Sequence, residues 1–248
     1  MNQRERPALA APDDPQIPLF EMLPAFEEEG AAPFEPGPVA RTVLDEDSAP
    51  GEQCRLLGAR LVALGRDKRL RRIGVVGAGP GEGTTTVALG LARALSRDRN
   101  RRVLLLELDL RRPSLDDELG LKPPAAGLRQ YLAGKCEVPV LRRSRPAGFW
   151  LLSAGGGAAS NEPVPSGARL ATLLRASDRV FDYVVADCPP ILDGGDGAAQ
   201  QGQLDGFVFV VRSRHAERET IRRAAALLEP GLIIGVVLNA QREIWRRS

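Results

Sequence analysis

Short runs of consecutive apolar residues recur along the chain from residue 73 onward. Because both faces of such a run are apolar, each is typical of a strand buried on both sides in a parallel sheet. The runs cover residues 73–78, 103–109, 149–153, 181–187, 206–212 and 232–239. The sequence therefore predicts that these six segments are the strands of one sheet.

Between most of these runs, apolar residues return every three or four positions, which is the spacing of a helix with one buried face. A further helix of this kind is predicted before the first strand. The predicted helices cover residues 52–64, 84–96, 166–177 and 217–228. Strands that alternate with helices need right-handed crossovers, so we expect an α/β fold with a doubly wound, mostly parallel sheet.

The first 50 residues differ from the rest of the chain in charge and proline content. Residues 1–52 carry 12 acidic and 3 basic side chains, whereas residues 53–248 carry 20 acidic and 31 basic ones. Nine of the 20 prolines lie in this acidic part, and proline interrupts helices and sheets. We predict a disordered tail at 1–50, a folded domain at 51–241 and a short basic tail at 242–248. The apolar segment 17–26 is either a docking motif, a segment that folds back on the basic body, or incidental to a solubilising tail.

Composition also argues against several classes of protein. The apolar runs fall far short of the roughly 18 residues that span a bilayer, and no apolar stretch typical of a signal peptide follows Met1. We therefore expect a cytoplasmic protein. Its three cysteines, Cys54, Cys136 and Cys188, form no C-x-x-C pair, which argues against a disulfide framework, a zinc knuckle or an iron–sulfur site.

A glycine-rich loop joins the first predicted strand to the helix that follows. Residues 77–86 read Gly-Ala-Gly-Pro-Gly-Glu-Gly-Thr-Thr-Thr. In this context backbone N–H groups and the positive end of the helix dipole surround a phosphate. The dinucleotide pattern G-x-G-x-x-G fails here, whereas the P-loop template fits with Gly83 as its last glycine and Thr85 as the hydroxyl for Mg²⁺. Thr84, however, stands at the position of the P-loop lysine.

Acidic residues end two of the later strands. Glu107 and Asp109 are two residues apart and therefore point to the same face, and Asp187 ends another strand. Carboxylates at strand ends, opposite a phosphate-binding loop, supply oxygen ligands for Mg²⁺ and an acceptor for a hydroxyl proton. Any one of them fits a helix cap, but the three together indicate phosphoryl transfer.

In the order of its motifs the chain resembles the bacterial tyrosine kinases of capsule and exopolysaccharide synthesis (BY-kinases), relatives of the Mrp/MinD branch of P-loop ATPases. The resemblance extends over about residues 50–240. It is carried by residues 52–57, 80–86, 107–113, 127–134, 187–190 and 235–239.

The resemblance implies a P-loop domain that binds ATP or ADP with Mg²⁺ and phosphorylates tyrosine in trans within a ring of subunits. The helix that contains residues 52–57 is similar to the helix through which the family forms homo-oligomers. The resemblance further implies activation by the cytosolic tail of a membrane polysaccharide co-polymerase, which recruits the protein to the inner face of the plasma membrane.

The same resemblance assigns roles to individual residues. Those implied to surround the nucleotide phosphates are Gly79, Pro80, Gly81, Glu82, Gly83, Thr84, Thr85 and Thr86. Asn239 is expected near the adenine. Asp109 and Asp187, together with Thr85, are expected to hold Mg²⁺, and Glu107 is expected near the reacting hydroxyl. The implied catalytic residues are Glu107, Asp109 and Asp187.

Three departures separate the chain from the family pattern. Thr84 replaces the lysine, Glu107 replaces an aspartate, and the only tyrosines are Tyr131 and Tyr183, so the C-terminal tyrosine cluster is absent. Our interpretation is a pseudokinase that binds nucleotide, has weakened or lost kinase activity, and acts through assembly. One alternative is an active kinase in which another cation replaces the lysine. A second is a MinD/ParA-type positioning ATPase, against which the lack of a lysine at residues 78–80 argues.

Two further features are interpreted as unrelated to catalysis. Arginines cluster at residues 97–102 and 142–145, but no aromatic side chains interleave with them, so a nucleic-acid partner is not expected. His215, the only histidine, is interpreted as a residue at the start of a helix rather than as a general base.

Overall fold

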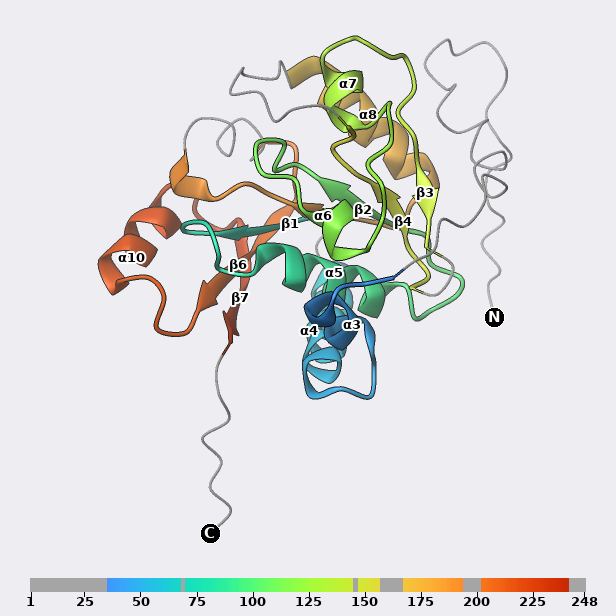
Figure 1. The fold of residues 1–248 in the computed structure, drawn as a ribbon. Helices are drawn as coiled ribbons and strands as arrows, with labels where there is room; N and C mark the ends of the chain where they lie inside the picture. The colour runs from blue at the N-terminus through green and yellow to red at the C-terminus, as the bar shows by residue number, and fades with distance from the viewer. Residues whose placement is uncertain (1–34, 68–69, 145–146, 157–166, 194–201, 241–248) are drawn as a thin grey trace.

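A seven-stranded sheet in the order β3-β4-β2-β5-β1-β6-β7 forms the centre of the molecule (Figure 1). The computed structural model describes residues 35–67, 70–144, 147–156, 167–193 and 202–240. The strands are β1 (Arg72–Gly77), β2 (Val103–Glu107), β3 (Arg142–Arg143), β4 (Trp150–Leu152), β5 (Tyr183–Asp187), β6 (Gly206–Arg212) and β7 (Ile233–Asn239). Neighbouring strands are parallel except for β3 and β4. The six predicted strands and the mostly parallel sheet are confirmed, whereas β3, only two residues long, has no signal in the sequence.

Helices cover both faces of this sheet (Figure 1). They are α3 (Pro38–Leu44), α4 (Ala49–Asp67), α5 (Thr84–Leu95), α6 (Leu115–Glu118), α7 (Leu128–Leu132), α8 (Gly167–Val180) and α10 (Arg218–Ala226), with a 3₁₀ turn at Ile191–Asp193. Residues of α3, α4 and α5 pack into one apolar core, and residues of α7, α8 and α10 pack into the core on the other face. The expected doubly wound architecture is therefore present.

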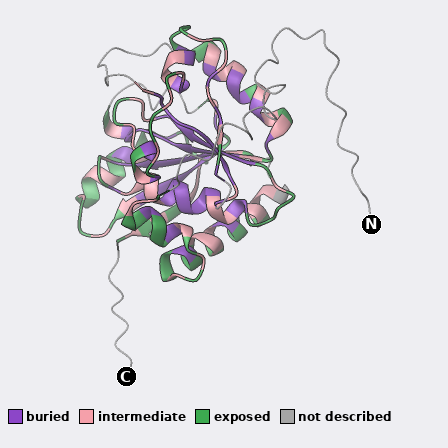
Figure 2. Cartoon of the chain, turned by 45° about the vertical axis from the view of Figure 1, so that its right-hand side comes forward, coloured by how far each residue is buried: buried purple, intermediate pink, exposed green. Residues whose placement is uncertain are grey.

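The alternation of side chains along a strand explains why β2 is apolar at successive positions. Val103 and Leu105 belong to the core of one face, and Leu104 and Leu106 belong to the core of the other. Fully burying each such side chain contributes roughly 1.5–3 kcal/mol. The purple strands at the centre of Figure 2 show the same two-sided burial along the middle of the sheet.

The edge strand β7 differs from this pattern. Val236 and Leu238 are 66% and 53% exposed, although the sequence predicts burial on both faces. The strand has a neighbour on one side only. The prediction of two-sided burial is therefore wrong for β7, because an apolar run does not reveal whether its strand lies at the centre or at the edge of a sheet.

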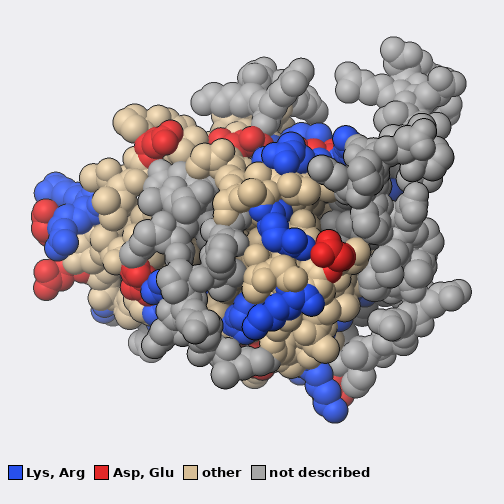
Figure 3. Space-filling view, turned by 90° about the horizontal axis from the view of Figure 1, so that it is seen from above, with Lys and Arg blue, Asp and Glu red and all other residues tan. Residues whose placement is uncertain are grey.

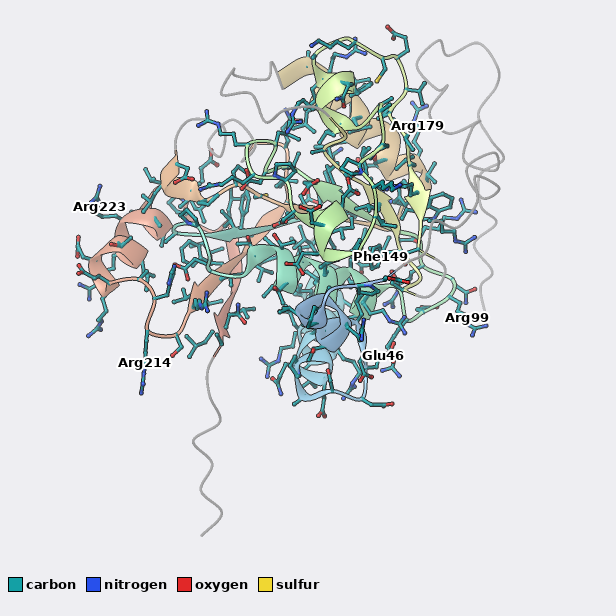
Figure 4. All side chains as sticks on the ribbon, in the orientation of Figure 1. Glu46, Arg99, Phe149, Arg179, Arg214 and Arg223 are labelled. Carbon is teal, nitrogen blue, oxygen red and sulfur yellow. The ribbon has the colours of Figure 1, made fainter. Side chains whose placement is uncertain are left out.

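The folded part of the chain begins well before residue 51. Helix α3 has Pro38 in its first turn, where the missing N–H of proline costs no intrahelical bond. Its residues Ala40 and Val43 are buried in the core beside α5. Glu46, labelled in Figure 4, forms ion pairs with Arg93 and Arg97 at 2.7 and 2.9 Å. The prediction of disorder is thus wrong for residues 35–50, while residues 1–34, which include segment 17–26, and the predicted tail 242–248 lie outside the described residues.

In the described part of the chain, no helix is both long enough and apolar enough to cross a membrane.

Candidate functional site

The sheet order brings the predicted site residues to one edge. Strand β1 lies between β5 and β6, and β2 lies beside β5. Since these strands are parallel, their carboxyl ends meet at the same edge, where open α/β sheets bind their ligands. The glycine-rich loop (residues 77–86), Asp109, Asp187 and Asn239 all follow or end strands there.

The glycine-rich loop has the backbone geometry of an anion-binding turn. Gly81 and Gly83 have φ angles of +80° and +90°, which glycine adopts without steric cost. A Cβ at Gly83 would collide with the side-chain nitrogen of Asn239, whereas a Cβ at Gly79 would meet open space. Helix α5 begins at Thr84, with Thr86 in its first turn, so the positive end of its dipole lies at the loop. The predicted succession of strand, loop and helix is confirmed.

Thr84 and Thr85 are both directed toward the acidic part of the site. Both side chains act on the carboxylate of Asp187, whose pKa they lower. The Thr85 hydroxyl also lies 3.0 Å from the hydroxyl of Ser114. At the position where a P-loop carries its ammonium group, this chain therefore has a short neutral side chain that contacts an acid.

Asp187 is a buried acid that ends β5, and Asp109 is a partly exposed acid that follows β2. Burial raises the pKa of Asp187 to about 8; hydrogen bonds from Thr85 and Thr84 lower it, whereas the charges of Glu107 and Asp109 raise it. Within the described residues, Oδ1 of Asp187 has no hydrogen-bond partner. Burial also raises the pKa of Asp109, an effect that the backbone N–H and the guanidinium of Arg112 partly offset. Both shifts reflect the cost of placing a negative charge where water solvates it poorly.

This donor set fits Mg²⁺ in the way that nucleotide sites bind it. Thr85, Asp109 and Asp187 offer oxygen ligands, and the buried Oδ1 of Asp187 has no partner among the residues that the structure describes. No three His, Cys, Asp or Glu side chains of the described residues are placed to hold an ion by themselves. Mg²⁺ typically binds through one or two carboxylates and depends on substrate phosphates for its remaining ligands.

Glu107 has different partners from those expected of a residue beside the reacting hydroxyl. Its Oε1 accepts the backbone N–H groups of Ser114 and Leu115 at 2.6 and 2.9 Å, and its Oε2 accepts that of Ala154 at 2.8 Å. The side chain is 1% exposed, and burial raises its pKa against these hydrogen bonds. The structure gives Glu107 a positioning role: it anchors the start of α6 and the chain after β4.

Asn239 lies against the glycine-rich loop, and its amide is occupied by backbone groups. Nδ2 donates to the carbonyl of Glu82 at 2.9 Å, and Oδ1 accepts the N–H of Ala240 at 2.8 Å. Asn239 thus contacts the loop, and its expected place near the adenine stays a prediction.

Two loop contacts were missed by the sequence analysis. Arg212 donates from Nη1 to the carbonyl of Gly81 at 3.1 Å, and His215 Nε2 lies 3.0 Å from the carbonyl of Pro80. The interpretation of His215 as a helix-start residue is incomplete, because α10 begins at Arg218 and His215 lies in the preceding loop. One available signal was that Arg212 ends a parallel strand, where ligand-site residues gather.

Comparison with known proteins supports the resemblance seen in the motifs. No protein-family model matches the chain. The chain is similar to the tyrosine-protein kinase CpsD of Streptococcus agalactiae, with 24% identity over 145 residues, which cover 57% of this chain and 63% of that relative. The match thus spans less than two thirds of the relative's length.

Two solved structures share the fold. The kinase domain of the Escherichia coli tyrosine kinase ETK matches with a TM-score of 0.71 and 22% identity, over 92% of this chain and 91% of that one. The septum site-determining protein MinD of Pyrococcus horikoshii, solved with Mg-ADP, matches with a TM-score of 0.55 and 21% identity, over 68% and 70% of the two chains. The predicted P-loop fold, with its likeness to bacterial tyrosine kinases and MinD-type ATPases, is confirmed.

Proposed function

From its similarity to tyrosine-protein kinases, we propose that this chain is a nucleotide-binding, BY-kinase-like component of exopolysaccharide or capsule synthesis whose kinase activity is weakened or lost. The observation that carries this proposal is the glycine-rich loop at the start of α5, opposite the acids Asp109 and Asp187, with Thr84 in place of the lysine. It is the arrangement of a phosphoryl-transfer site without its principal cation.

Each part of the site has a role in this proposal. The N–H groups of the loop and the α5 terminus bind the phosphates of ATP or ADP. Thr85, Asp109 and Asp187 hold Mg²⁺, which neutralises phosphate charge when bound. Asp109, whose carboxylate is partly accessible, is the acid available to accept a hydroxyl proton. Loss of one preorganised donor to the developing charge costs about 3–4 kcal/mol, or about 10²–10³ in rate, so binding is retained while transfer becomes slow.

We place the chain in the cytoplasm, as a homo-oligomer recruited to the inner face of the plasma membrane by the cytosolic tail of a polysaccharide co-polymerase. Helix α4 supports the assembly step. It presents Leu56 at 39% exposure beside an exposed ion pair between Glu52 and Arg55 at 3.6 Å. Exposed pairs of this kind contribute little within one chain, so their groups are available to a second subunit. Sedimentation should show self-association that Leu56→Glu abolishes, and a monomeric wild-type protein at high concentration contradicts it.

The charge on the face seen in Figure 3 gives no support to a nucleic-acid partner. On the face shown in Figure 3, Lys and Arg side chains form separate groups, several of them next to Asp or Glu, rather than one continuous stripe. A nucleic-acid site typically presents a clustered basic patch or stripe.

Isothermal titration with Mg-ADP and Mg-ATP, together with a phosphorylation assay, tests the proposed function. We expect both nucleotides to bind and little or no phosphate transfer to an added tyrosine peptide. The peptide has to be added because Tyr131 is 8% exposed and Tyr183 lies in the central strand β5. Absence of binding by both nucleotides contradicts the proposal, whereas strong phosphorylation by the wild-type protein favours the alternative of an active kinase with a substitute cation.

A further inference from the structure

Three consecutive carbonyl groups of the glycine-rich loop each lie at hydrogen-bond distance from a side chain on its outer side. The carbonyl oxygen of Pro80 lies 3.0 Å from His215 Nε2, that of Gly81 accepts from Arg212 Nη1 at 3.1 Å, and that of Glu82 accepts from Asn239 Nδ2 at 2.9 Å. All three side chains come from the ends of β6 and β7 and the loop that leads to α10 (Figure 1). We call Arg212, His215 and Asn239 the loop clamp.

The loop clamp is itself held in place by the sheet. Arg212 and Asn239 are register partners in the β6–β7 ladder. The N–H of Ser213 donates to the backbone carbonyl of Asn239 at 2.9 Å, and the Asn239 side chain accepts from Ala240. The backbone N–H of Arg212 donates to the Glu82 carboxylate, whose side chain is 1% exposed. The backbones of Arg212 and Asn239 are therefore fixed relative to the loop, whereas His215 is an exposed residue of the loop before α10.

Fixing the carbonyl groups also fixes the N–H groups of the same peptides. In a trans peptide the carbonyl and the following N–H point in opposite directions in one plane. The three clamped carbonyls belong to the peptides that carry the N–H groups of Gly81, Glu82 and Gly83. Among the described residues, none of these three N–H groups donates a hydrogen bond within the chain. They are directed away from β6 and β7 and are available to an anion.

The clamp also changes the charge distribution of the loop. A hydrogen bond from a guanidinium to a carbonyl oxygen polarises the peptide group, and hydrogen bonds in a chain strengthen one another. Arg212 therefore increases the positive character of the Glu82 N–H without contacting the ligand itself. Its effect reaches the phosphate through a peptide group, whereas a P-loop lysine contacts the phosphate directly.

We propose that Arg212, His215 and Asn239 are positioning residues that orient and polarise the N–H groups of Gly81, Glu82 and Gly83 for phosphate binding, so that the loop binds a nucleoside diphosphate without a lysine. This inference rests on the proposed nucleotide site and adds the residues that make it work. The loop clamp acts on the loop before any reaction begins, and it places no cation directly on the phosphate. It therefore supports nucleotide binding more than phosphate transfer.

Two pairs of variants distinguish the loss of a hydrogen bond from the loss of side-chain volume. Arg212→Ala and His215→Ala remove a donor, whereas Arg212→Lys and His215→Gln keep a donor at the same end of the side chain. Arg214→Ala is the matched control, because it removes one positive charge from the same loop and its side chain points away from the domain (Figure 4). Asn239→Asp keeps the shape but places a carboxylate against the Glu82 carbonyl.

Isothermal titration with Mg-ADP and with inorganic pyrophosphate is the first measurement. We expect Arg212→Ala to weaken both about 10-fold or more, because its donor is charged, and His215→Ala to weaken both about 3- to 10-fold. Arg212→Lys and His215→Gln should recover most of the affinity, and Arg214→Ala should stay within about twofold of wild type. Equal losses in the alanine and the conservative variants, or unchanged affinity in both alanine variants, overturn the proposal.

Amide hydrogen exchange of the nucleotide-free protein is the second measurement. Exchange at Gly81, Glu82 and Gly83 should change in Arg212→Ala, His215→Ala and Asn239→Asp, while the rest of the sheet keeps its protection and Arg214→Ala behaves as wild type. Unchanged exchange at these three amides overturns the clamp. If wild-type protein binds neither Mg-ADP nor Mg-ATP, the proposed function fails and the exchange result alone decides whether the clamp orders the loop.

Discussion

The loops that follow β1 and β2 reach the same edge of the sheet but are held in opposite ways. In the glycine-rich loop after β1, side chains bind the carbonyl groups and leave the N–H groups of residues 81–83 available. In the loop after β2, the Glu107 carboxylate binds the N–H groups of Ser114 and Leu115, so that backbone donors are already occupied.

This difference shows how two polar strand ends come to have different roles. After β2, an acid accepts from the backbone N–H groups and so stabilises the loop. After β1, side chains bind the carbonyl groups, and the N–H groups of the loop stay available to an anion. The two regions meet at Asp187, whose pKa Thr84 and Thr85 lower and whose Oδ1 has no partner in the described structure. We therefore expect an anion site on the β1 side and a cation site on the acidic side.

Gly83→Arg should destroy the anion site and give the largest effect. The φ of +90° and the collision of any Cβ with Asn239 mean that the loop has to rearrange. We expect ADP affinity to fall by about 100-fold or more, since loop donors and helix terminus are lost together. Titration with Mg-ADP measures this, and circular dichroism checks that the fold survives. Gly167→Ala, where a Cβ meets open space, is the control; unchanged ADP affinity in Gly83→Arg would show that the loop is not the site.

Thr84→Lys tests whether Asp109 and Asp187 can still support phosphate transfer when the lysine is restored. Restoring the charge beside the phosphates should raise ATP hydrolysis or phosphorylation of an added tyrosine peptide by about two orders of magnitude. Thr84→Met, which adds length without charge, is the control. Strong wild-type kinase activity contradicts the idea, because another residue then already replaces the lysine. A Thr84→Lys protein that binds ATP tightly but remains inactive also contradicts the idea, because the acids then no longer support the reaction.

Glu107→Gln tests whether Glu107 stabilises the fold more than Asp109, the second acid at the end of β2. An amide keeps one acceptor but places an NH₂ group against the N–H of Ala154, leaving buried donors without partners. We expect a loss of about 2 kcal/mol in the free energy of unfolding, measured by urea denaturation. Asp109→Asn, at 15% side-chain exposure, should cost much less. Equal losses in the two variants would remove the distinction between a positioning acid and an available one.

The pH dependence of stability gives the smallest effect when it is measured over a single pH unit. The pKa of Asp187 rises from 3.8 to about 8 on folding, so between these values the folded protein holds a proton that the unfolded chain releases. The free energy of unfolding of the nucleotide-free protein should therefore fall as pH rises through this window, by about 1 kcal/mol per pH unit from this group. Asp187→Asn should flatten that slope, whereas Asp117→Asn, an exposed acid, should not. A slope that Asp187→Asn leaves unaltered would mean that the acid is solvated.

The limits of prediction are clearest where burial or long-range contacts decide. The acidic, proline-rich composition of residues 35–50 predicts disorder, yet Pro38 starts a helix and Glu46 pairs with Arg93 of α5. The apolar run of β7 is like that of β2, but only the sheet order shows that β7 lies at an edge. In both cases the deciding partner lies elsewhere in the chain.

What the sequence by itself determined are the features that depend on neighbouring residues: the apolar runs that become strands, the glycines that need positive φ, and the threonine at the lysine position. Only the tertiary structure decided which polar groups remain available. Arg212 and His215 reach the glycine-rich loop from 131 and 135 residues away, and Glu107 reaches Ala154 across 47. A hydrogen bond depends on the relative position of two groups in space, and for groups so far apart in the chain that position is set by strand order and by packing of the sheet.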